Sequence, residues 1–492
     1  MVSKMAIKIG KFTLETLTTG MYDSPKDIYR EYIQNAVDSI DNAVNQGILK
    51  SGEDCIDIKI DSLNECITII DNGEGISVTK AQEYLLNIGD SAKFNTNNRG
   101  FRGIGRLAGL AYCDELTFST SCYGESTKTN ITFNANELRK SLYAIEDNAS
   151  LEEIFTKIVT ISTENETKSK HYFSVKLCGV SNVDGILNYE EVYKYLSQVA
   201  PVPFSPKFKW KDIVNSKLLY RGLKIGEYNI FIEEKERRQL YKNYSDSFLA
   251  DRVRKSEDKI DDIEEKLFID DDGNALAVLW FAKTSYSGTI QNELIKSIRL
   301  RKGNIQLGAK NVLNAFFKDE RFNGWLIGEL HIISSELIPN ARRDNLEKTK
   351  AYYDLQAQLN AWADEISSII RRISVSRNTD KTNKRIEKII EETSESAVML
   401  EKVEILPEII LNDKQEYDDV AHSELMNKLD ILMSQNRICT KYKALNLQSG
   451  ITIEEKKVLE TVLDIIQEHH SDKSERLISI IIREYKSKHS SK

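Results

Sequence analysis

The chain has 492 residues, enough for about three domains at roughly 150 residues each. Charged residues make up 29% of it and hydrophobic residues 40%, and 68 basic against 76 acidic side chains leave a net charge of -8. A globular protein with this balance cannot bind nucleic acid through its overall charge, so such binding needs a local basic patch. The six cysteines show neither the C-x-x-C spacing of a zinc site nor a disulfide framework.

The chain offers no membrane-spanning or secretory signal. Its longest apolar run, from Ala275 to Ala282, is far shorter than the roughly 20 residues that cross a bilayer. The first residues, MVSKMAIKIGKF, lack the apolar centre of a signal peptide. With scattered cysteines as well, we expect a cytoplasmic protein in a reducing compartment and no membrane partner.

A first motif follows Ser24, which has the sequence of a helix start. Ser24 is the expected N-cap, Pro25 fits the first turn, and Asp27 places negative charge near the positive end of the helix. The helix should end near Gly47. One face is apolar, and polar residues recur on another at helical spacing: Glu31, Asn35, Asp38 and Asn42. Periodicity alone makes this stripe either a solvated face or one wall of a site.

A second motif lies at the end of a predicted strand. Residues 56–60 and 66–70 are typical of two strands joined by a polar turn, and the second runs into DNGEG. The carboxylate of Asp71, followed by Gly73 and Gly75, suits recognition of a planar base through its exocyclic amine. The same sequence is also common in tight turns.

A third motif is rich in glycine and arginine and covers residues 98–109, NRGFRGIGRLAG. It predicts a phosphate cradle of backbone N–H groups leading into an apolar helix. Gly103, Gly105 and Ala108 also match a dinucleotide-binding fingerprint, but that fingerprint must directly follow a strand, and residues 93–102 are polar. The chain contains no P-loop sequence.

The remaining chain divides at prolines. Pro201, Pro203 and Pro206 predict an extended connector, which separates domains over residues 1–200, 201–346 and 347–492. In the middle domain, residues 266–270 and 274–282 flank Asp271-Asp272-Gly273 as a hairpin, and residues 297–301 alternate apolar and basic like a strand.

The last domain is expected to be helical. An apolar stripe there recurs at spacings of three and four: Tyr352, Leu355, Leu359, Trp362, Ile366, Ile369 and Ile373. It indicates an amphipathic helix packed on its own domain or, alternatively, the seam of a coiled-coil dimer. A further helix is predicted from Thr452 to about His469.

Taken together and in this order, REYIQNAVDSI, DNGEGIS and GFRGIGRLAG resemble the nucleotide-binding motifs of the GHKL ATPases. The likeness is greatest to the heat-shock chaperone branch, in TLETLTTGMYDSPKDIYREYIQNAVDSI and LLNIGDSAKF. The resemblance implies an α+β Bergerat fold, which is a mixed sheet covered by helices on one face. It further implies a mixed α/β transducer-like domain and an α-helical C-terminal region. The family's last nucleotide-domain Gly-Thr motif has no clear counterpart before Pro201.

The resemblance also implies an activity and its residues. It predicts hydrolysis of ATP to ADP and phosphate, with ATP and Mg²⁺ as cofactors. Glu31 would be the general base that activates water, Asn35 would hold Mg²⁺, and Asp71 would accept a hydrogen bond from the adenine amine. The other ATP-binding positions that it implies are Asp38, Gly73, Gly75, Lys93, Gly100, Gly103, Ile104 and Gly105.

A further likeness lies downstream in LIPNARRDNL, residues 337–346. It resembles the chaperone middle-domain loop whose arginine reaches the γ-phosphate. Arg343 takes that catalytic position and Arg342 stands beside it. A cation on a separate domain neutralises transition-state charge only when the domains have closed. The alternative is a surface arginine pair at the start of a helix.

Partners follow from the same resemblance. It implies an ATP-dependent homodimer that remodels or gates a protein client or effector, and compact relatives of this kind occur in bacterial anti-phage defence. The alternative is an ATP-gated nucleic-acid clamp like the MutL, MORC or gyrase B relatives. Two basic segments, residues 207–224 and 296–310, would then supply the contact, although such segments are commonly solvated surface.

Overall fold

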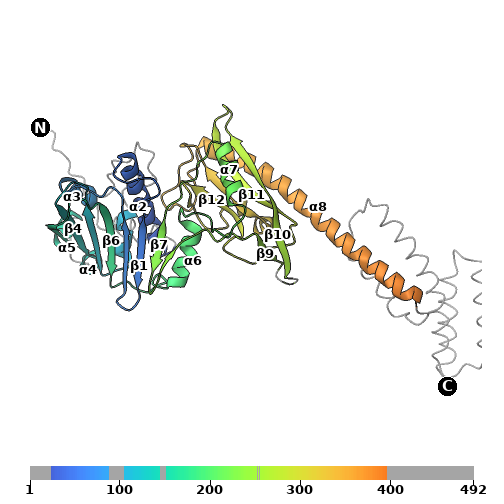
Figure 1. The fold of residues 1–492 in the computed structure, drawn as a ribbon, viewed down its shortest axis with the longest axis horizontal. Helices are drawn as coiled ribbons and strands as arrows, with labels where there is room; N and C mark the ends of the chain where they lie inside the picture. The colour runs from blue at the N-terminus through green and yellow to red at the C-terminus, as the bar shows by residue number, and fades with distance from the viewer. Residues whose placement is uncertain (1–23, 88–104, 144–150, 252, 254, 396–492) are drawn as a thin grey trace, which may run out of the picture. The chain divides into compact units, whose positions relative to one another are not determined.

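The computed structural model describes residues 24–87, 105–143, 151–251, 253 and 255–395 (Figure 1). Contacts divide the chain into two units, residues 1–371 and 372–492. All elements below lie in the first unit, except the end of the last helix. Two sheets organise this unit.

The first sheet has eight strands in the order β5-β4-β3-β6-β2-β1-β7-β8. Its pairs are antiparallel except β1 with β7, so the sheet is mixed, as the resemblance implies. The strands predicted at residues 56–60 and 66–70 are confirmed as β1 and β2. The bounds are β1 (Ile56–Asp61), β2 (Cys66–Asp71), β3 (Glu115–Ser121), β4 (Thr127–Asn134), β5 (Val159–Asn165), β6 (Tyr172–Cys178), β7 (Ile230–Glu233) and β8 (Arg237–Gln239).

Helix α2 (Asp27–Asn45) confirms the first predicted helix and packs on this sheet. Its apolar side chains, such as Ile33 and Val37, share one core with Ile58 and Ile69 of the strands. The helix begins three residues after the expected N-cap, because residues 25 and 26 form a turn, and it ends before Gly47. The other helices near this sheet are α3 (Val78–Leu86), α4 (Ala135–Tyr143), α5 (Leu151–Ile158), α6 (Tyr189–Val199) and the 3-10 helix η1 (Gly105–Ala111).

The second sheet has six strands in the order β13-β12-β14-β11-β10-β9. The predicted hairpin is confirmed, since β10 and β11 pair antiparallel around Gly273, whose φ of 85° suits glycine. The strands are β9 (Ser247–Ala250), β10 (Ser256–Ile269), β11 (Ala275–Thr284), β12 (Ser297–Lys302), β13 (Ile305–Gln306) and β14 (Ile327–Ile332). Helix α7 (Lys211–Tyr220) and the 3-10 helices η2 (Asn314–Phe316) and η3 (Glu320–Trp325) accompany them.

The chain passes between the two sheets more than once, which differs from the predicted boundary at residue 200. After the prolines, Phe208 and Val214 enter the core of the second sheet. The chain then returns, and Ile230 pairs with Ile56 as β7 adds to the edge of β1. Residues 228–240 therefore complete the first sheet. A proline-rich connector marks an extended segment, but it does not reveal which sheet the following strand joins.

Strand β12 confirms the strand predicted at residues 297–301, but its basic side chains are not solvated. The strand lies between β13 and β14, and both of its faces are covered. Arg299 and Arg301 are 2% and 1% exposed. The alternation of apolar and basic residues therefore predicted the strand correctly, but it did not indicate that the basic side chains face water.

The buried partner of Arg301 is Glu329 on β14. Its Oε1 lies 2.6 Å from Arg301 Nε, and its Oε2 lies 2.8 Å from Lys242 Nζ. The Tyr244 hydroxyl donates to Oε1 at 3.1 Å, and His331 Nε2 lies 3.0 Å from Oε2. Burial opposes ionisation, but the charges of Arg301 and Lys242 outweigh it and hold the pKa of Glu329 well below its ordinary value. We call these five residues the Glu329 cluster.

Helix α8 (Lys350–Glu395) follows the second sheet. Leu355, Leu359 and Ile366 of its apolar stripe are buried, and the Trp362 ring lies 5.4 Å from that of Phe281 on β11. The beginning of the stripe thus packs on the second sheet, whereas the first alternative expected it to pack within residues 347–492. The helix predicted from Thr452 lies outside the described residues.

Within the described ranges, no helix is long and apolar enough to span a membrane.

We predict that Glu329→Gln lowers the free energy of unfolding by about 3–5 kcal/mol, because it leaves two buried cations without a counter-charge. Urea unfolding of the purified protein measures the loss. The matched control is Glu53→Gln, whose carboxylate is 59% exposed and lies 4.0 Å from Lys50. Its unfolding free energy should hardly change. Equal losses in both variants would contradict a structural role for the cluster.

Candidate functional site

Helix α2 turns its polar stripe toward the protein interior. Glu31 is 4% exposed and Asp38 is 1% exposed, while Asn35 is half-buried. The stripe is therefore not a solvated helix face. Burial of carboxylates is costly unless charges or hydrogen bonds compensate it, so their surroundings are informative.

Glu31 meets an arginine that is distant in the sequence. Arg343 Nε lies 3.4 Å from Glu31 Oε1, and Arg30 Nε lies 3.8 Å from the same oxygen. Among the described residues, this buried oxygen accepts no hydrogen bond. Two guanidinium groups thus compensate the charge of Glu31 and leave the acceptor capacity of Oε1 unused.

The two neighbouring arginines of the 337–346 segment differ in their placement. The Arg343 side chain is 15% exposed and reaches Glu31, whereas Arg342 is exposed. The carbonyl of Arg342 accepts a hydrogen bond from the Arg30 guanidinium at 3.4 Å. The segment therefore approaches the start of α2 with the Arg343 side chain and the Arg342 backbone.

Asp71 ends β2 and is 4% exposed. Its Oδ1 accepts a hydrogen bond from Gly73 N at 2.9 Å. Burial raises the pKa of Asp71 to about 7, although hydrogen bonds from Gly73, Ser39 and Phe173 act in the opposite direction. A buried carboxyl at the end of a strand is therefore poised to gain from an added hydrogen-bond donor.

The glycines after Asp71 have a packing role that the sequence did not suggest. A Cβ on Gly73 would lie 2.1 Å from Ser39 Oγ of α2. Gly75 has a φ of 69°, and its Cβ would lie 1.9 Å from the Ser121 carbonyl oxygen of β3. Both positions exclude a side chain because the protein itself fills the space.

Two contacts that the sequence analysis did not predict hold this segment. Asn42 Nδ2, at the end of the polar stripe, donates to Glu74 Oε1 at 2.7 Å. His171 Nδ1 lies 2.7 Å from the Gly73 carbonyl oxygen. Asn42 thus binds the loop that follows β2, and the stripe joins α2 to that loop. The helical spacing that placed Asn42 on the stripe with Glu31 could not have identified Glu74 as the partner of Asn42.

The glycine-rich segment is described only from Gly105 onward. Lys93, Gly100, Gly103 and Ile104 lie outside the described residues. Gly105 begins η1, a seven-residue 3-10 helix where the sequence predicted an apolar helix. The Arg106 guanidinium donates to the Asn87 carbonyl and lies over the Tyr84 ring. Arg106 is thus buried against the protein.

Asn35 is the residue of this site that could supply an oxygen ligand to a magnesium ion. Asn35 lies one helical turn after Glu31, and its side chain makes no hydrogen bond with another described residue. Mg²⁺ usually keeps several waters and takes one or two protein oxygens together with substrate phosphates. An amide oxygen one helical turn from Glu31 could meet that demand. In the part of the chain that the structure describes, no cluster of three or more His, Cys, Asp and Glu could hold a metal ion.

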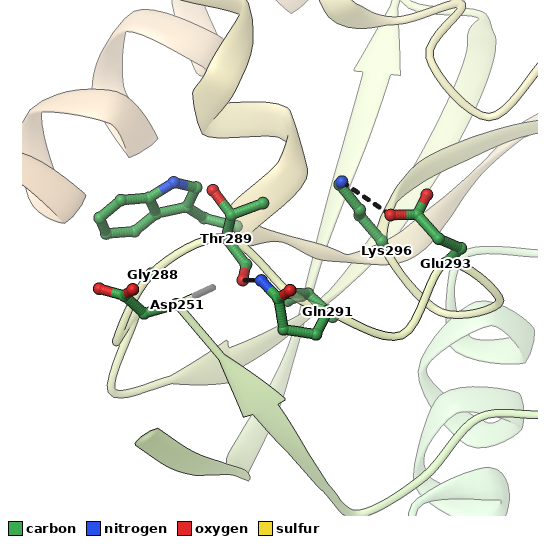
Figure 2. A pocket seen from close by; sticks show the side chains of 8 residues that line it. Asp251, Gly288, Thr289, Gln291, Glu293 and Lys296 are labelled. Carbon is green, nitrogen blue, oxygen red and sulfur yellow. Dashed lines mark hydrogen bonds and ion pairs between the residues drawn. The ribbon is translucent and has the colours of Figure 1, made fainter. Parts of the chain in front are cut away.

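A pocket of about 530 Å³ lies elsewhere, beside the second sheet (Figure 2). Figure 2 shows Lys296 pointing to Glu293, and their charges pair at 3.0 Å. The pocket contains none of the site residues that the sequence predicted. It is lined by Asp251, Gly288, Thr289, Ile290, Gln291, Glu293, Lys296 and Trp325.

Comparison with known proteins supports a class for the first domain. Residues 24–171 match a family model described as histidine kinase-, DNA gyrase B- and HSP90-like ATPase. The matched segment contains Glu31, Asn35 and Asp71 but does not extend to Arg343. No curated protein sequence matched the chain. The match supports the GHKL superfamily for this segment, and a domain of this class suggests ATP binding and hydrolysis, generally with Mg²⁺.

The raised pKa of Asp71 predicts a pH-dependent contribution to stability. The folded state binds the proton of the Asp71 carboxyl group more tightly than the unfolded state does, because an aspartate in the unfolded chain has a pKa of about 3.9. The contribution is therefore present at low pH and is lost as the pH rises from about 4 to about 7. Relative to Asp71→Asn, the wild-type protein should lose up to about 4 kcal/mol of unfolding free energy over this window. Urea unfolding at a series of pH values measures this loss. If the unfolding free energies of the two proteins changed in parallel with pH, the raised pKa of Asp71 would be contradicted.

Proposed function

We propose that this protein is a Mg²⁺-dependent ATPase of the GHKL type, nearest to the chaperone-like branch, which hydrolyses ATP to ADP and phosphate. The proposal is that nucleotide binding and hydrolysis switch its conformation and so remodel or gate a protein partner. The observation that carries it is the approach of Arg343 Nε to within 3.4 Å of Glu31 Oε1. Glu31 lies on α2, which packs on the first sheet, and Arg343 lies in the loop that follows β14 of the second sheet. The two residues come from two separate sequence likenesses.

Glu31 is the proposed general base. Its Oε1 is buried and accepts no hydrogen bond from a described residue, so a water molecule could donate to it. A base must lie within hydrogen-bond reach of the proton that it takes, and a carboxylate oxygen already engaged by a donor would be less available. The adjacent guanidinium groups of Arg30 and Arg343 compensate the charge that the buried carboxylate carries.

Asp71 and Asn35 are the proposed binding residues. The Asp71 carboxylate would accept a hydrogen bond from the adenine amine, which would favour its ionised form in a buried setting. Asn35 would hold Mg²⁺ through its amide oxygen. When bound, Mg²⁺ would neutralise charge on the phosphates. Asp38 is buried one turn further along the same helix and would face the nucleotide from that position.

Arg343 would stabilise negative charge on the γ-phosphate. Its loop belongs to the second sheet's domain, so charge stabilisation would depend on how that domain meets α2. This dependence is the physical basis of the proposed switch. Hydrolysis would occur only when Arg343 is close to the nucleotide, so turnover would be coupled to a movement that a partner can sense.

The proposed partner is a protein, and the proposed assembly is a homodimer in the cytoplasm. The likeness of residues 13–40 to the chaperone branch supports a protein client or effector. A role in anti-phage defence rests on the same resemblance to compact bacterial relatives.

The basic segments lend less support to a nucleic-acid clamp. In residues 296–310, Arg299 and Arg301 are buried, and Lys302 donates to the Leu337 carbonyl at 2.7 Å. Lys296 and Lys310 both pair with Glu293. These basic side chains therefore make contacts within the protein, and a nucleic-acid phosphate backbone could bind them only by breaking those contacts.

The second basic segment, residues 207–224, is only partly engaged. Lys217 and Arg221 both pair with Glu265, at 2.7 Å and 3.4 Å. Lys207, Lys209 and Lys224 are exposed, and Lys209 lies 3.7 Å from Asp246. Three exposed lysines, one of them paired with an aspartate, make a small positive surface, so we favour the protein partner.

We predict that Glu31→Ala binds ATP but hydrolyses it roughly 10²-fold more slowly, because the attacking water loses its general base. Calorimetry measures binding, and phosphate release measures turnover. Glu53→Ala, an exposed glutamate outside the site, serves as the control and should keep parental turnover. Parental turnover in Glu31→Ala would reduce Glu31 to a structural residue of α2.

We predict that Arg343→Ala lowers ATP turnover at least about tenfold and leaves ADP affinity almost unchanged, since ADP lacks the γ-phosphate. Arg342→Ala is the matched control, because its exposed side chain lies next in sequence. It should have the smaller effect. If Arg342→Ala is the severe variant, the assignment is wrong by one residue; if neither changes turnover, the coupling between domains is wrong.

A further inference from the structure

Arg343 has an unusual backbone conformation. Its φ is 56°, in the left-handed region that residues with a side chain seldom adopt. Such a conformation carries a cost and persists only where its surroundings impose it. The contacts of residues 340–345 therefore identify what holds Arg343 in place.

Asn340 brackets Arg343 from within the loop. Its carbonyl accepts from Arg343 N at 3.1 Å, and its N–H donates to the Asn345 carbonyl at 2.9 Å. Its side-chain Oδ1 accepts from Asp344 N at 3.2 Å, while its Nδ2 donates to Asp344 Oδ1 at 2.5 Å. The backbone on both sides of Arg343 is thus tied to one residue.

Gly308 supports the loop from the second sheet. Its N–H donates to the Arg343 carbonyl at 2.9 Å. Its own φ is 65°, and a Cβ there would lie 2.2 Å from the Asp344 carbonyl oxygen. Gly308 follows β13 and is held by Gln306, whose Nε2 donates to the Gly308 carbonyl at 2.9 Å. The loop therefore rests on a position where no side chain fits.

We infer that Gly308 and Asn340 are positioning residues for Arg343, which together impose the left-handed backbone that directs its guanidinium to Glu31. The direction of a side chain follows from the backbone conformation at its Cα. If φ of Arg343 relaxed to a negative value, its Cβ would point elsewhere and the 3.4 Å contact with Glu31 would be lost. The inference rests on the proposed role of Arg343 in ATP hydrolysis.

The test is Gly308→Ala with Gly273→Ala as its matched control. Gly273 also has a positive φ, of 85°, but nothing lies within 4 Å of the Cβ that alanine would add. Both variants carry backbone strain, and only Gly308→Ala collides with the Arg343 loop. We expect Gly308→Ala to lower kcat for ATP at least about tenfold, because a displacement of about 1 Å at a reacting centre can cost more than that. KM and ADP affinity should stay near parental values, and Gly273→Ala should keep parental kcat.

A double-variant cycle separates positioning from a general loss of structure. If Gly308 acts through Arg343, adding Gly308→Ala to Arg343→Ala should not lower kcat further. The inference would be overturned if the double variant lost kcat by the product of the two single losses. It would also be overturned if Gly308→Ala kept parental kcat while Arg343→Ala was impaired. Either outcome would leave the proposed function intact. A parental kcat in Arg343→Ala itself would overturn both.

Asn340→Ala provides a second route if Gly308→Ala does not fold. It removes the side-chain hydrogen bonds to Asp344 and introduces no collision. We expect the same lowered kcat with unchanged ADP affinity, and again no further loss on the Arg343→Ala background. A parental kcat in a folded Asn340→Ala would remove Asn340 from the assignment.

Discussion

The buried carboxylate of Glu329 is the interaction on which the junction of the two sheets depends. It brings Arg301 of β12 and Lys242, which follows β8, to one point in the interior. Each charge would be prohibitively costly alone, and they are tolerated because they compensate one another and are hydrogen-bonded. A network of this kind admits one arrangement of its segments, since any slip leaves a buried charge unpaired.

From this cluster, hydrogen bonds extend to helix α2, which packs on the first sheet. Arg301 also donates to the Gln198 carbonyl, at the end of α6, at 2.6 Å. Along α6, the Tyr195 hydroxyl donates to Asp27 Oδ1 at the start of α2 at 2.7 Å. The helix that carries Glu31 is thus tied through α6 to the second sheet. The β12-β13 segment also continues to Gly308, whose N–H donates to the Arg343 carbonyl at 2.9 Å. Both residues of the Glu31–Arg343 contact are thus linked to this segment.

The loop after β2 shows how packing and chemistry share residues. Gly73 and Gly75 lack side chains because α2 and β3 approach them closely, and the same closeness buries Asp71. Burial in turn raises the pKa of Asp71 to about 7. A motif that is commonly explained by ligand access is here also a packing constraint, and the altered ionisation of its carboxyl follows from that constraint.

The sequence by itself determined the elements whose signals are local. Helix α2, the β1-β2 pair, the β10-β11 hairpin and the start of α8 follow from periodicities of 3.6 and 2 and from turn residues, which depend on near neighbours in the chain. Glu31 and Asp71 were predicted because they lie within such elements and within an ordered set of motifs. Only the tertiary structure decided that β7 joins β1, that Arg299 and Arg301 are buried, and that Arg343 meets Glu31. These facts depend on contacts between residues that are not near neighbours in the chain, and a pattern along the chain does not record which distant charge will neutralise a buried one.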